Sequence, residues 1–326
     1  MRYAASEKLE IIRLVEQSHQ PVTTTLAQLG IPKTTFYRWY DRYQAFGTAG
    51  LEDRRPHPGR VWNRIPDDVR EEVVELALDE PDLSPRELAV RFTDTKKHYV
   101  SEASVYRILK ERDLITSPAF VVVKAADEFR DKTTRPNELW QTDFTYLKVT
   151  GWGWYYLSTI LDDFSRYVVA WRLCTTMKAA DVTDTLEDAL SASGCDAATV
   201  IHKPRLLSDN GSSYISGDLA DWLGDHGMDH VRGAPNHPQT QGKIERWHQT
   251  LKNRILLENY YQPGALEQAV GTFIDHYNHV RCHASIGNVT PADAYFGRAP
   301  AILEERRRIK TETLKQRRLL NQKQAA

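Results

Sequence analysis

The sequence of 326 residues has only three cysteines, almost no net charge and no long hydrophobic run. The cysteines, Cys174, Cys195 and Cys282, form no CxxC pair, so they fit neither a disulfide framework nor a cysteine zinc site and suit a reducing cytoplasm. No apolar run approaches the roughly 18 residues of a membrane-spanning helix, and the N-terminus lacks the apolar core of a secretory signal. The sequence therefore predicts a cytoplasmic protein that has no membrane partner.

The formal net charge of −1 conceals an uneven distribution of charge along the chain. Residues 304–326 contain eight arginines and lysines but only three glutamates, and residues 51–64 are rich in arginine and proline. A protein that binds DNA can be neutral overall if its cations gather on one face. We interpret residues 51–64 as a basic linker and residues 301–326 as a basic C-terminal tail, either helical or disordered.

Residues 1–50 have the pattern of a helix-turn-helix domain that binds DNA. Ser6 begins a run with helical spacing, and a short second helix ends at Gly30, before a third helix starts. The start of the third helix would face the major groove, and the residues predicted to contact DNA there are Lys33, Thr34, Thr35 and Arg38. Phe36 and Trp39 are expected to pack inward. An ordinary three-helix bundle is the alternative.

Residues 65–116 are predicted to form a second, helix-turn-helix-like domain. Ser84 and Glu87 have the spacing of a capping box with proline at the first helical position, and Ser101 begins another helix. The candidate DNA contacts on that helix are Ser104 and Arg107. A purely structural helical domain is equally compatible with this pattern. Residues 117–136 show no clear period and are interpreted as a linker.

The pattern changes in residues 137–300, where strands and helices follow one another in the order βββ-α-β-α-β-α. This order describes a mixed sheet flanked by helices. The predicted strands are residues 139–149, 154–162, 167–174 and 228–233, and residues 200–207 are predicted to end in a strand. The predicted helices are residues 179–193, 214–226, 239–259 and 263–277. In the first hairpin, four aromatic side chains could either stack on bases or form the hairpin core: Trp152, Trp154, Tyr155 and Tyr156.

Three acidic residues stand where regular elements would present them to a common site. Asp143 lies inside the first strand, where a carboxylate is costly to bury unless it is paired or bound to a metal. Asp209 follows an apolar run, so it lies at the carboxyl end of a strand, where open α/β sheets place ligands. Glu245 lies one turn into the long helix, and His248 and Lys252 share its face. No single acid is diagnostic, and the inference depends on the set.

The chemistry of displacement at a phosphodiester explains the use of such a set. Two Mg²⁺ ions, roughly 3.5–4 Å apart, stabilise both the attacking and the leaving oxygen, and Mg²⁺ prefers a few carboxylates together with water and substrate oxygens. Gly211, just after Asp209, is expected to allow a sharp turn, and Lys252 would reach a phosphate as a point charge. We predict two Mg²⁺ ions, or Mn²⁺ in their place, held by Asp143, Asp209 and Glu245.

Three motifs resemble those of insertion-sequence transposases whose catalytic core is similar to that of retroviral integrases. They are WQTDFTYL around Asp143, SDNGSSY around Asp209 and HPQTQGKIERWHQTLK around Glu245, and 35 residues separate the second acid from the third. The segment FIDHYNHVRCHASIGNVTPADAYFG resembles the usual ending of this core, so the resemblance covers about residues 135–298. The His/Cys zinc-binding arm of retroviral integrases is absent from the sequence, and helix-turn-helix domains stand in its place.

The resemblance implies an α/β fold, a ribonuclease-H-like mixed sheet with flanking helices, preceded by all-α helix-turn-helix domains. It implies that the three acids bind the catalytic metal ions and that DNA is contacted at Lys243, His248 and Lys252. The implied activity is that of a DNA transposase, which cuts at transposon ends and joins the 3′-hydroxyl to target DNA by transesterification. The expected partners are double-stranded DNA and, because two ends must meet, further copies of the chain in a homo-oligomer on the nucleoid.

Two other functions are compatible with parts of the sequence. A domesticated transposase could act as a sequence-specific DNA-binding regulator without catalysis, although the intact set of acids argues against this. A nuclease of ribonuclease-H type would cut RNA in hybrids, but two helix-turn-helix domains favour duplex DNA. Metal-dependent activity separates the enzymes from the regulator, and the substrate separates the two enzymes.

Overall fold

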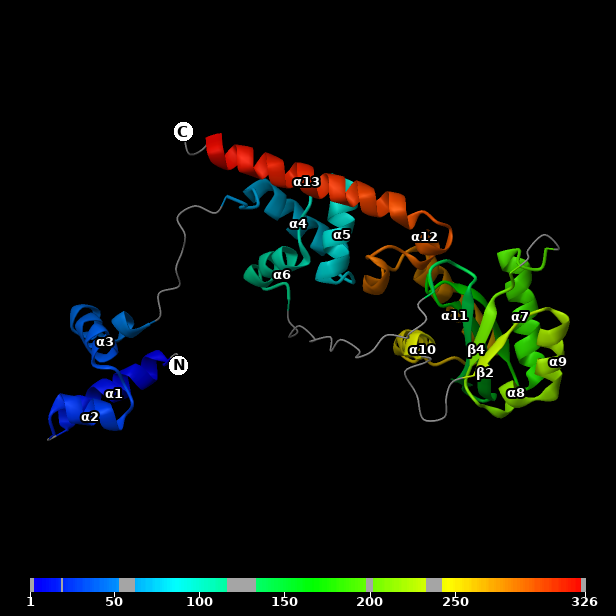
Figure 1. Cartoon of the computed structure of the whole chain (residues 1–326), viewed down its shortest axis with the longest axis horizontal. Coiled ribbons are helices and arrows are strands. Elements are labelled where there is room, and N and C mark those ends of the chain that lie inside the picture. Colours follow the sequence, from blue (N-terminus) through cyan, green and yellow to red (C-terminus); the bar gives the residue numbers. More distant parts are fainter. Residues whose placement is uncertain are drawn as a thin grey trace. The chain divides into compact units, whose positions relative to one another are not determined.

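The computed structural model describes residues 3–18, 20–52, 62–115, 133–197, 202–232 and 242–323 (Figure 1). Most of the predicted basic linker and of the second linker lies outside the described residues, as do residues 233–241, which precede the helix of the third motif. The chain divides into two compact units, Met1–Trp62 and Asn63–Ala326. None of the helices in the described residues is long and apolar enough to cross a membrane.

Three helices and a 3₁₀ helix form the N-terminal unit: α1 (Ala5–Gln17), α2 (Val22–Gln28), α3 (Lys33–Phe46) and η1 (Gly47–Leu51). Gly30 has a φ of +66°, a conformation that glycine adopts at little cost, and this lets the chain turn between α2 and α3. Phe36 and Trp39 are buried in the core of this unit, as predicted. The predicted DNA contacts lie at the start of α3, with Thr35 partly buried and three side chains exposed: Lys33, Thr34 and Arg38.

The second unit begins with three helices: α4 (Asp67–Asp79), α5 (Pro85–Lys96) and α6 (Glu102–Glu111). The predicted capping box at the start of α5 is confirmed, because Ser84 Oγ accepts from the Glu87 N–H and the Ser84 N–H donates to Glu87 Oε2. Ser101 caps α6, also as predicted. Phe92 and Val105 lie in the core that joins the three helices. We call α4, α5 and α6 together the second helical domain.

A five-stranded mixed sheet follows, with the strand order β3-β2-β1-β4-β5. Its strands are β1 (Leu139–Val149), β2 (Gly153–Asp162), β3 (Val168–Cys174), β4 (Arg205–Ser208) and β5 (His230–Arg232). β1, β2 and β3 are antiparallel, whereas β4 runs parallel to both β1 and β5. The pairing with β4 involves Leu139, Trp140 and Gln141, at the start of β1.

Helices cover both faces of this sheet (Figure 1). One face packs against α7 (Ala179–Ser193), α8 (Ser212–Ile215) and α9 (Gly217–Asp225) through a core that includes Trp140 and Leu186. The other packs against α10 (Gly242–Ile255) and α11 (Pro263–His279) through a core that includes Leu147 and Trp247. The single helix predicted over residues 214–226 is two helices, because Ser216 is extended and its hydroxyl caps α9.

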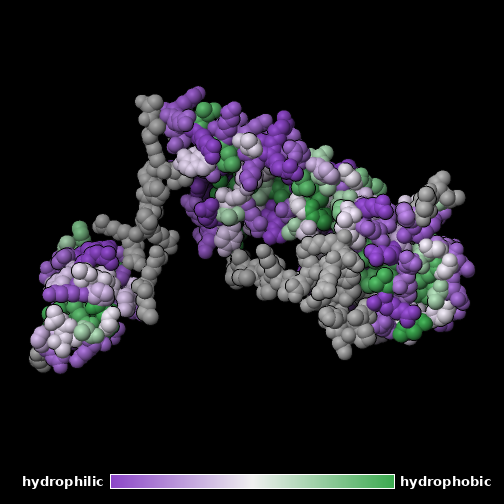
Figure 2. Space-filling model, in the orientation of Figure 1, coloured by the Kyte–Doolittle hydropathy of each residue, from purple (hydrophilic) through white to green (hydrophobic). Residues whose placement is uncertain are grey.

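The C-terminal segment forms η3 (Ala284–Ile286), α12 (Pro291–Tyr295) and the long helix α13 (Ala299–Lys323). α13 runs alongside the second helical domain (Figure 1), and hydrophilic residues cover much of its visible surface (Figure 2). Its inner side is nonetheless buried at Ile309, Thr313 and Arg317. The basic tail predicted from composition is therefore, as far as Lys323, a docked helix.

Two arginines of α13 are used for this docking. Arg306 makes a bidentate ion pair with Asp94 on α5, at 2.8 and 2.6 Å, and donates to the carbonyl of Asn288 in the loop before α12. Arg317 donates to the carbonyl of Tyr99 and to His98 Nε2, which accepts because a guanidinium has only donors. Burial lowers the pKa of both side chains. Arg306 thus joins the second helical domain to the residues that follow the sheet.

We expect Arg306→Ala to reduce the free energy of unfolding of the second unit by about 1–3 kcal/mol, because it leaves Asp94 and a carbonyl without their partner. The matched control is Arg307→Ala. The side chain of Arg307 is 72% exposed and pairs with Glu304 one turn away, whereas that of Arg306 is 16% exposed. The control should change stability by less than about 0.5 kcal/mol. Urea unfolding followed by circular dichroism measures both, and equal losses would show that α13 is not held through Arg306.

Candidate active site

The parallel pairing of β1 and β4 places Asp143 and Asp209 at the same level of the sheet. Gln141 pairs with Leu207, and each aspartate lies two residues further along the chain. Both residues therefore lie at the carboxyl edge of β4, Asp209 just after this strand and Asp143 beside it in the middle of β1. Tyr214 on α8 lies behind them: burial raises the pKa of its phenol, and the charges of Asp143 and Asp209 add to that rise.

Asp143 is held between its own strand and α10. Its Oδ1 accepts from the Phe144 N–H at 2.8 Å, and its Oδ2 lies 3.4 Å from Nδ1 of His248. The side chain of His248 is buried, whereas that of Asp143 keeps a quarter of its surface exposed. Asp143 thus faces the helix that carries the third acid.

Asp209 is exposed in the turn just after β4, where its Oδ1 accepts from the Gly211 N–H at 2.9 Å. The expected role of Gly211 in a sharp turn is not what the backbone shows, because Gly211 has an extended φ of −62° that any residue can adopt. Its lack of a side chain matters for a different reason. A Cβ added at Gly211 would lie only 3.0 Å from Asp209 Oδ1, so the glycine leaves room for this carboxylate.

Glu245 lies in the first turn of α10, with its side chain exposed, and three residues before His248. The contact between His248 and Asp143 therefore brings the helix, and with it Glu245, to the edge where the two aspartates lie. Within the described part of the chain, no three acidic, histidine or cysteine side chains are close enough together to hold a metal ion. The structure thus brings together Asp143 and Asp209 and places the helix of Glu245 beside them.

The chemistry of these three carboxylates fits hard divalent cations. In the residues that the structure describes, no lysine or arginine forms an ion pair with Asp143, Asp209 or Glu245. Asp163, by contrast, is paired with Lys243. Carboxylates that share one edge without a countercharge favour Mg²⁺, which binds oxygen ligands and retains water.

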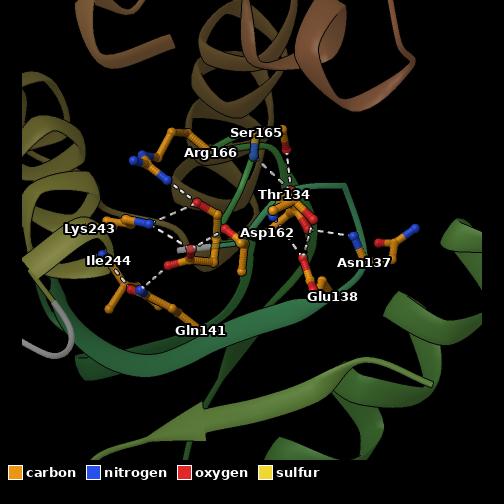
Figure 3. Close-up of polar contacts among 11 residues, drawn as sticks. Thr134, Asn137, Glu138, Gln141, Asp162, Ser165, Arg166, Lys243 and Ile244 are labelled. Carbon is orange, nitrogen blue, oxygen red and sulfur yellow. Dashed lines mark hydrogen bonds and ion pairs between the residues drawn. The ribbon is translucent and has the colours of Figure 1, made fainter. Parts of the chain in front are cut away.

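A group of polar residues, which we call the anchoring network, fastens the start of α10 to β1 (Figure 3). Its centre is Asp163, just after β2: Oδ1 accepts from Gln141 Nε2 at 2.8 Å, and Oδ2 accepts from Lys243 Nζ at 2.6 Å. The Ile244 N–H donates to Gln141 Oε1 at 3.1 Å. The first turn of α10 is therefore bonded to β1 at a residue two positions before Asp143.

Burial sets the charges in the anchoring network. Burial lowers the pKa of the Lys243 ammonium group, the charge of Arg166 adds to this, and Asp163 opposes it. The Arg166 guanidinium donates to the carbonyl of Asp163. Two cations thus lie beside one buried carboxylate, and Asp163 is the countercharge that makes their positions favourable.

The buried side chain of Asp162 stabilises the adjoining turn between β2 and β3 through hydrogen bonds (Figure 3). Its Oδ2 accepts from the N–H and hydroxyl of Ser165 at 2.8 and 2.6 Å, and its Oδ1 accepts from the Asn137 N–H at 2.8 Å. Burial raises the pKa of Asp162, and these hydrogen bonds oppose the rise. The turn that presents Asp163 is therefore itself fixed.

The residues predicted to contact DNA in the second unit differ in their surroundings. Lys243 is paired with Asp163, and His248 is buried against Asp143, so both have intramolecular contacts. The hydroxyl of Ser104 lies 2.9 Å from that of Ser101, whereas Arg107 is exposed on α6. Lys252 lies with its ammonium group 4.2 Å from the ring centre of Tyr146 on β1. Their DNA contacts stay predictions. Of these residues, Arg107 is exposed, whereas Lys252 is partly buried.

Sequence reasoning missed Gln141 and Asp163. Gln141 lies within the WQTDFTYL motif, and its burial in an otherwise apolar stretch of β1 was the available signal. Asp163 follows Asp162 at the end of a strand, and two acids in this place are typical of an ordinary polar turn. Only the fold shows that Lys243 contacts Asp163.

Comparisons with known proteins agree with this architecture. The integrase core domain family matches residues 133–238, and a second integrase core domain family matches residues 226–291. A helix-turn-helix domain family matches residues 7–60, and a homeodomain-like domain family matches residues 35–109. The predicted fold class, a ribonuclease-H-like mixed sheet with flanking helices preceded by helix-turn-helix domains, is confirmed.

Similar proteins include the transposase for insertion sequence element IS629 of Shigella sonnei, 32% identical over 59% of this chain and 62% of that protein. The transposase for element IS904 of Lactococcus lactis is 27% identical over 50% of this chain and 62% of that protein. The chain thus spans less than two thirds of the length of these relatives. Among solved structures, the HTLV-2 integrase catalytic core domain in complex with magnesium is 21% identical, with a TM-score of 0.40 over 49% of this chain and 97% of that one.

We expect Asp163→Asn to lower the free energy of unfolding by about 2–4 kcal/mol, because Lys243 and Arg166 lose their countercharge in a buried setting. Hydrogen exchange of the Ile244 amide should also become faster, since this amide is bonded through Gln141 to the same network. The control, Asp188→Asn, breaks an exposed ion pair with Arg172 and should cost less than about 1 kcal/mol. Equal costs and an unchanged Ile244 amide would refute the anchoring role.

Proposed function

We propose that this chain, which carries an integrase core behind helix-turn-helix domains and is similar to insertion-sequence transposases, is itself a DNA transposase. The reaction is cleavage at the ends of a mobile element and transesterification of the freed 3′-hydroxyl onto target DNA. The observation that carries the proposal is the shared edge of Asp143 and Asp209, beside which the anchoring network holds the helix of Glu245.

Asp143, Asp209 and Glu245 are the proposed ligands of two Mg²⁺ ions, for which Mn²⁺ can substitute. When bound, such ions stabilise the charge on the attacking and the leaving oxygen of a phosphodiester. The side chains of this protein supply the geometry. One oxygen of Asp143 and one of Asp209 accept a backbone N–H, which fixes how each carboxylate is turned. His248 Nδ1 contacts the other oxygen of Asp143, and this contact holds α10 against β1.

DNA recognition is assigned to the helical domains and to α10. Lys33, Thr34, Thr35 and Arg38 lie at the start of α3, which is the part of a recognition helix that reaches base edges in the major groove. Ser104 and Arg107 have the equivalent place on α6. On α10, Lys252 is proposed to contact a phosphate. Lys243 and His248 are proposed both to contact DNA and to hold α10 in place.

The reaction requires that two element ends and a target meet in one complex. We therefore propose that the chain acts as a homo-oligomer on double-stranded DNA, associated with the nucleoid. The helix-turn-helix domains favour duplex DNA over an RNA hybrid, and an uncompensated set of three acids has no use in a regulator that only binds.

The test of the chemistry is a strand-transfer assay with purified protein, a labelled duplex that carries the element's end, and Mg²⁺ or Mn²⁺. Wild-type protein should give products longer than the substrate. Glu245→Gln should reduce the rate by more than the roughly 10–100-fold that loss of a supporting outer-shell group costs, because it removes a metal ligand. Duplex binding in EDTA should be unchanged.

The matched control is Glu267→Gln, since Glu267 is an exposed glutamate on the neighbouring helix α11 and should have no effect. Tight binding of the duplex by wild type, with neither cutting nor joining in either metal, would instead support a DNA-binding regulator. Cutting of RNA in a hybrid would support the nuclease.

The recognition role of α3 is tested with Arg38→Ala. Loss of a base contact should weaken binding to the element's end by about 1–3 kcal/mol and reduce the preference for that sequence over a scrambled one. The control is Arg13→Ala, because Arg13 is exposed on α1, outside the turn that leads into α3. Fluorescence anisotropy at two salt concentrations measures both. An Arg38→Ala protein that keeps its sequence preference would remove α3 from the recognition surface.

A further inference from the structure

The hairpin of β1 and β2 leaves large aromatic side chains in solvent. Trp152, Trp154 and Tyr146 are 65%, 53% and 57% exposed, whereas Tyr155 packs against the core between the sheet and α10. The interpretation of the hairpin aromatics as core residues therefore holds for Tyr155 but is wrong for Trp152 and Trp154. Exposed rings of this size need an explanation that a hydrophobic core does not give.

Two of these rings and one cation form a defined cluster. The rings of Tyr146 and Trp154 meet edge to face, with their centres 5.4 Å apart and their planes at 81°. The ammonium group of Lys252 lies 4.2 Å from the centre of the Tyr146 ring. Lys148 is exposed and lies directly opposite Trp154 in the register of the hairpin. We call Tyr146, Trp154 and Lys252 the aromatic platform.

α10 links the aromatic platform to the proposed active site. Along α10, His248 touches Asp143 and Lys252, one turn later, touches Tyr146. Along β1, Tyr146 is three residues, or about 10 Å, beyond Asp143, so the two side chains start on opposite faces of the strand. Lys252 of α10 is the residue that reaches the Tyr146 ring. A distance of about 10 Å corresponds to about three base steps of a DNA strand. A strand with its reacting phosphate at Asp143 can therefore place a nearby nucleotide on the platform.

The chemistry of the aromatic platform favours a nucleotide over a protein surface. Two lysines beside exposed rings attract phosphate, whereas the centres of protein interfaces are depleted in lysine. Aromatic faces bind bases by stacking, and arginine or lysine beside them adds to the attraction. Bases inside a duplex are covered by their neighbours, so a base must be unpaired to reach the rings.

We propose that the aromatic platform binds an unpaired base of the DNA end, next to the phosphodiester that reacts. The inference rests on the proposed function for its choice of DNA as ligand, and it adds a preference for ends that are frayed or carry an overhang. Trp154 supplies the stacking face, Tyr146 buttresses it, and Lys252 binds the adjoining phosphate.

The experiment uses the full chain in EDTA, so that binding is measured without chemistry. The probes are a short duplex of arbitrary sequence with an unpaired, fluorescent 2-aminopurine at its 3′ end, and the same duplex fully paired. Wild type should prefer the unpaired probe and quench its fluorescence. Trp154→Ala should weaken binding of the unpaired probe about tenfold, with little effect on the paired one, and lose the quenching. Trp154→Phe should retain part of both.

The control variant is Trp152→Ala, which removes an equally exposed ring from the same hairpin but leaves the aromatic platform intact, and it should behave as wild type. Thermal unfolding establishes that each variant is folded. If Trp154→Ala keeps the preference and the quenching, the platform is refuted even where strand transfer by wild type is observed. If it changes only the sedimentation of the protein, the rings are an interface between copies and the proposal is likewise refuted. If wild type shows no strand transfer but the Trp154-dependent preference is present, the platform stands and the proposed chemistry falls.

Discussion

The placement of α10 depends on one buried carboxylate, Asp163. Strand pairing alone puts Asp143 and Asp209 side by side, because neighbouring parallel strands have a fixed register. Nothing in the sheet determines the height or rotation of a helix packed on its face. Asp163 supplies that constraint, because it accepts hydrogen bonds from Gln141 on β1 and from Lys243 on α10. The Ile244 N–H of α10 also donates to Gln141, so α10 and β1 are bonded to each other directly as well. Directional hydrogen bonds thus fix the position and rotation of α10. The apolar contacts of Trp247 cannot do so alone, because apolar contacts tolerate sliding and rotation.

Local sequence was sufficient for most of the elements and for where the three acids stand on them. Alternating residues predicted β1 over the same residues that the structure shows, and short-range capping signals located the start of α5. The anchoring network was not predictable, because its contacts join Gln141 to residues 22 and 103 positions away. Ser216 is a second feature that the sequence did not predict. A serine can continue a helix, and only the observed backbone shows that the Ser216 hydroxyl caps a new helix.

The C-terminal helix shows why composition misleads about function. A segment with many arginines reads as a surface for DNA, yet Arg306 and Arg317 face inward and bind Asp94, Tyr99 and His98. Burial lowers the pKa of Arg317, which has neutral acceptors in place of a carboxylate. On the exposed side of α13, Arg307 and Arg308 are paired with Glu304 and Glu305, so an argument from net charge must be made for each face separately.

The short pairing between β1 and β4 has a consequence for solubility. Beyond Gln141, β1 continues for eight residues without β4 beside it, and an open strand edge is a template for pairing with another chain. The helix of Glu245 runs along this stretch, touching it at Asp143 and again at Tyr146. The same helix therefore acts as a guard against edge-to-edge aggregation. A change that loosens this helix is therefore expected to uncover the strand edge as well as to displace Glu245.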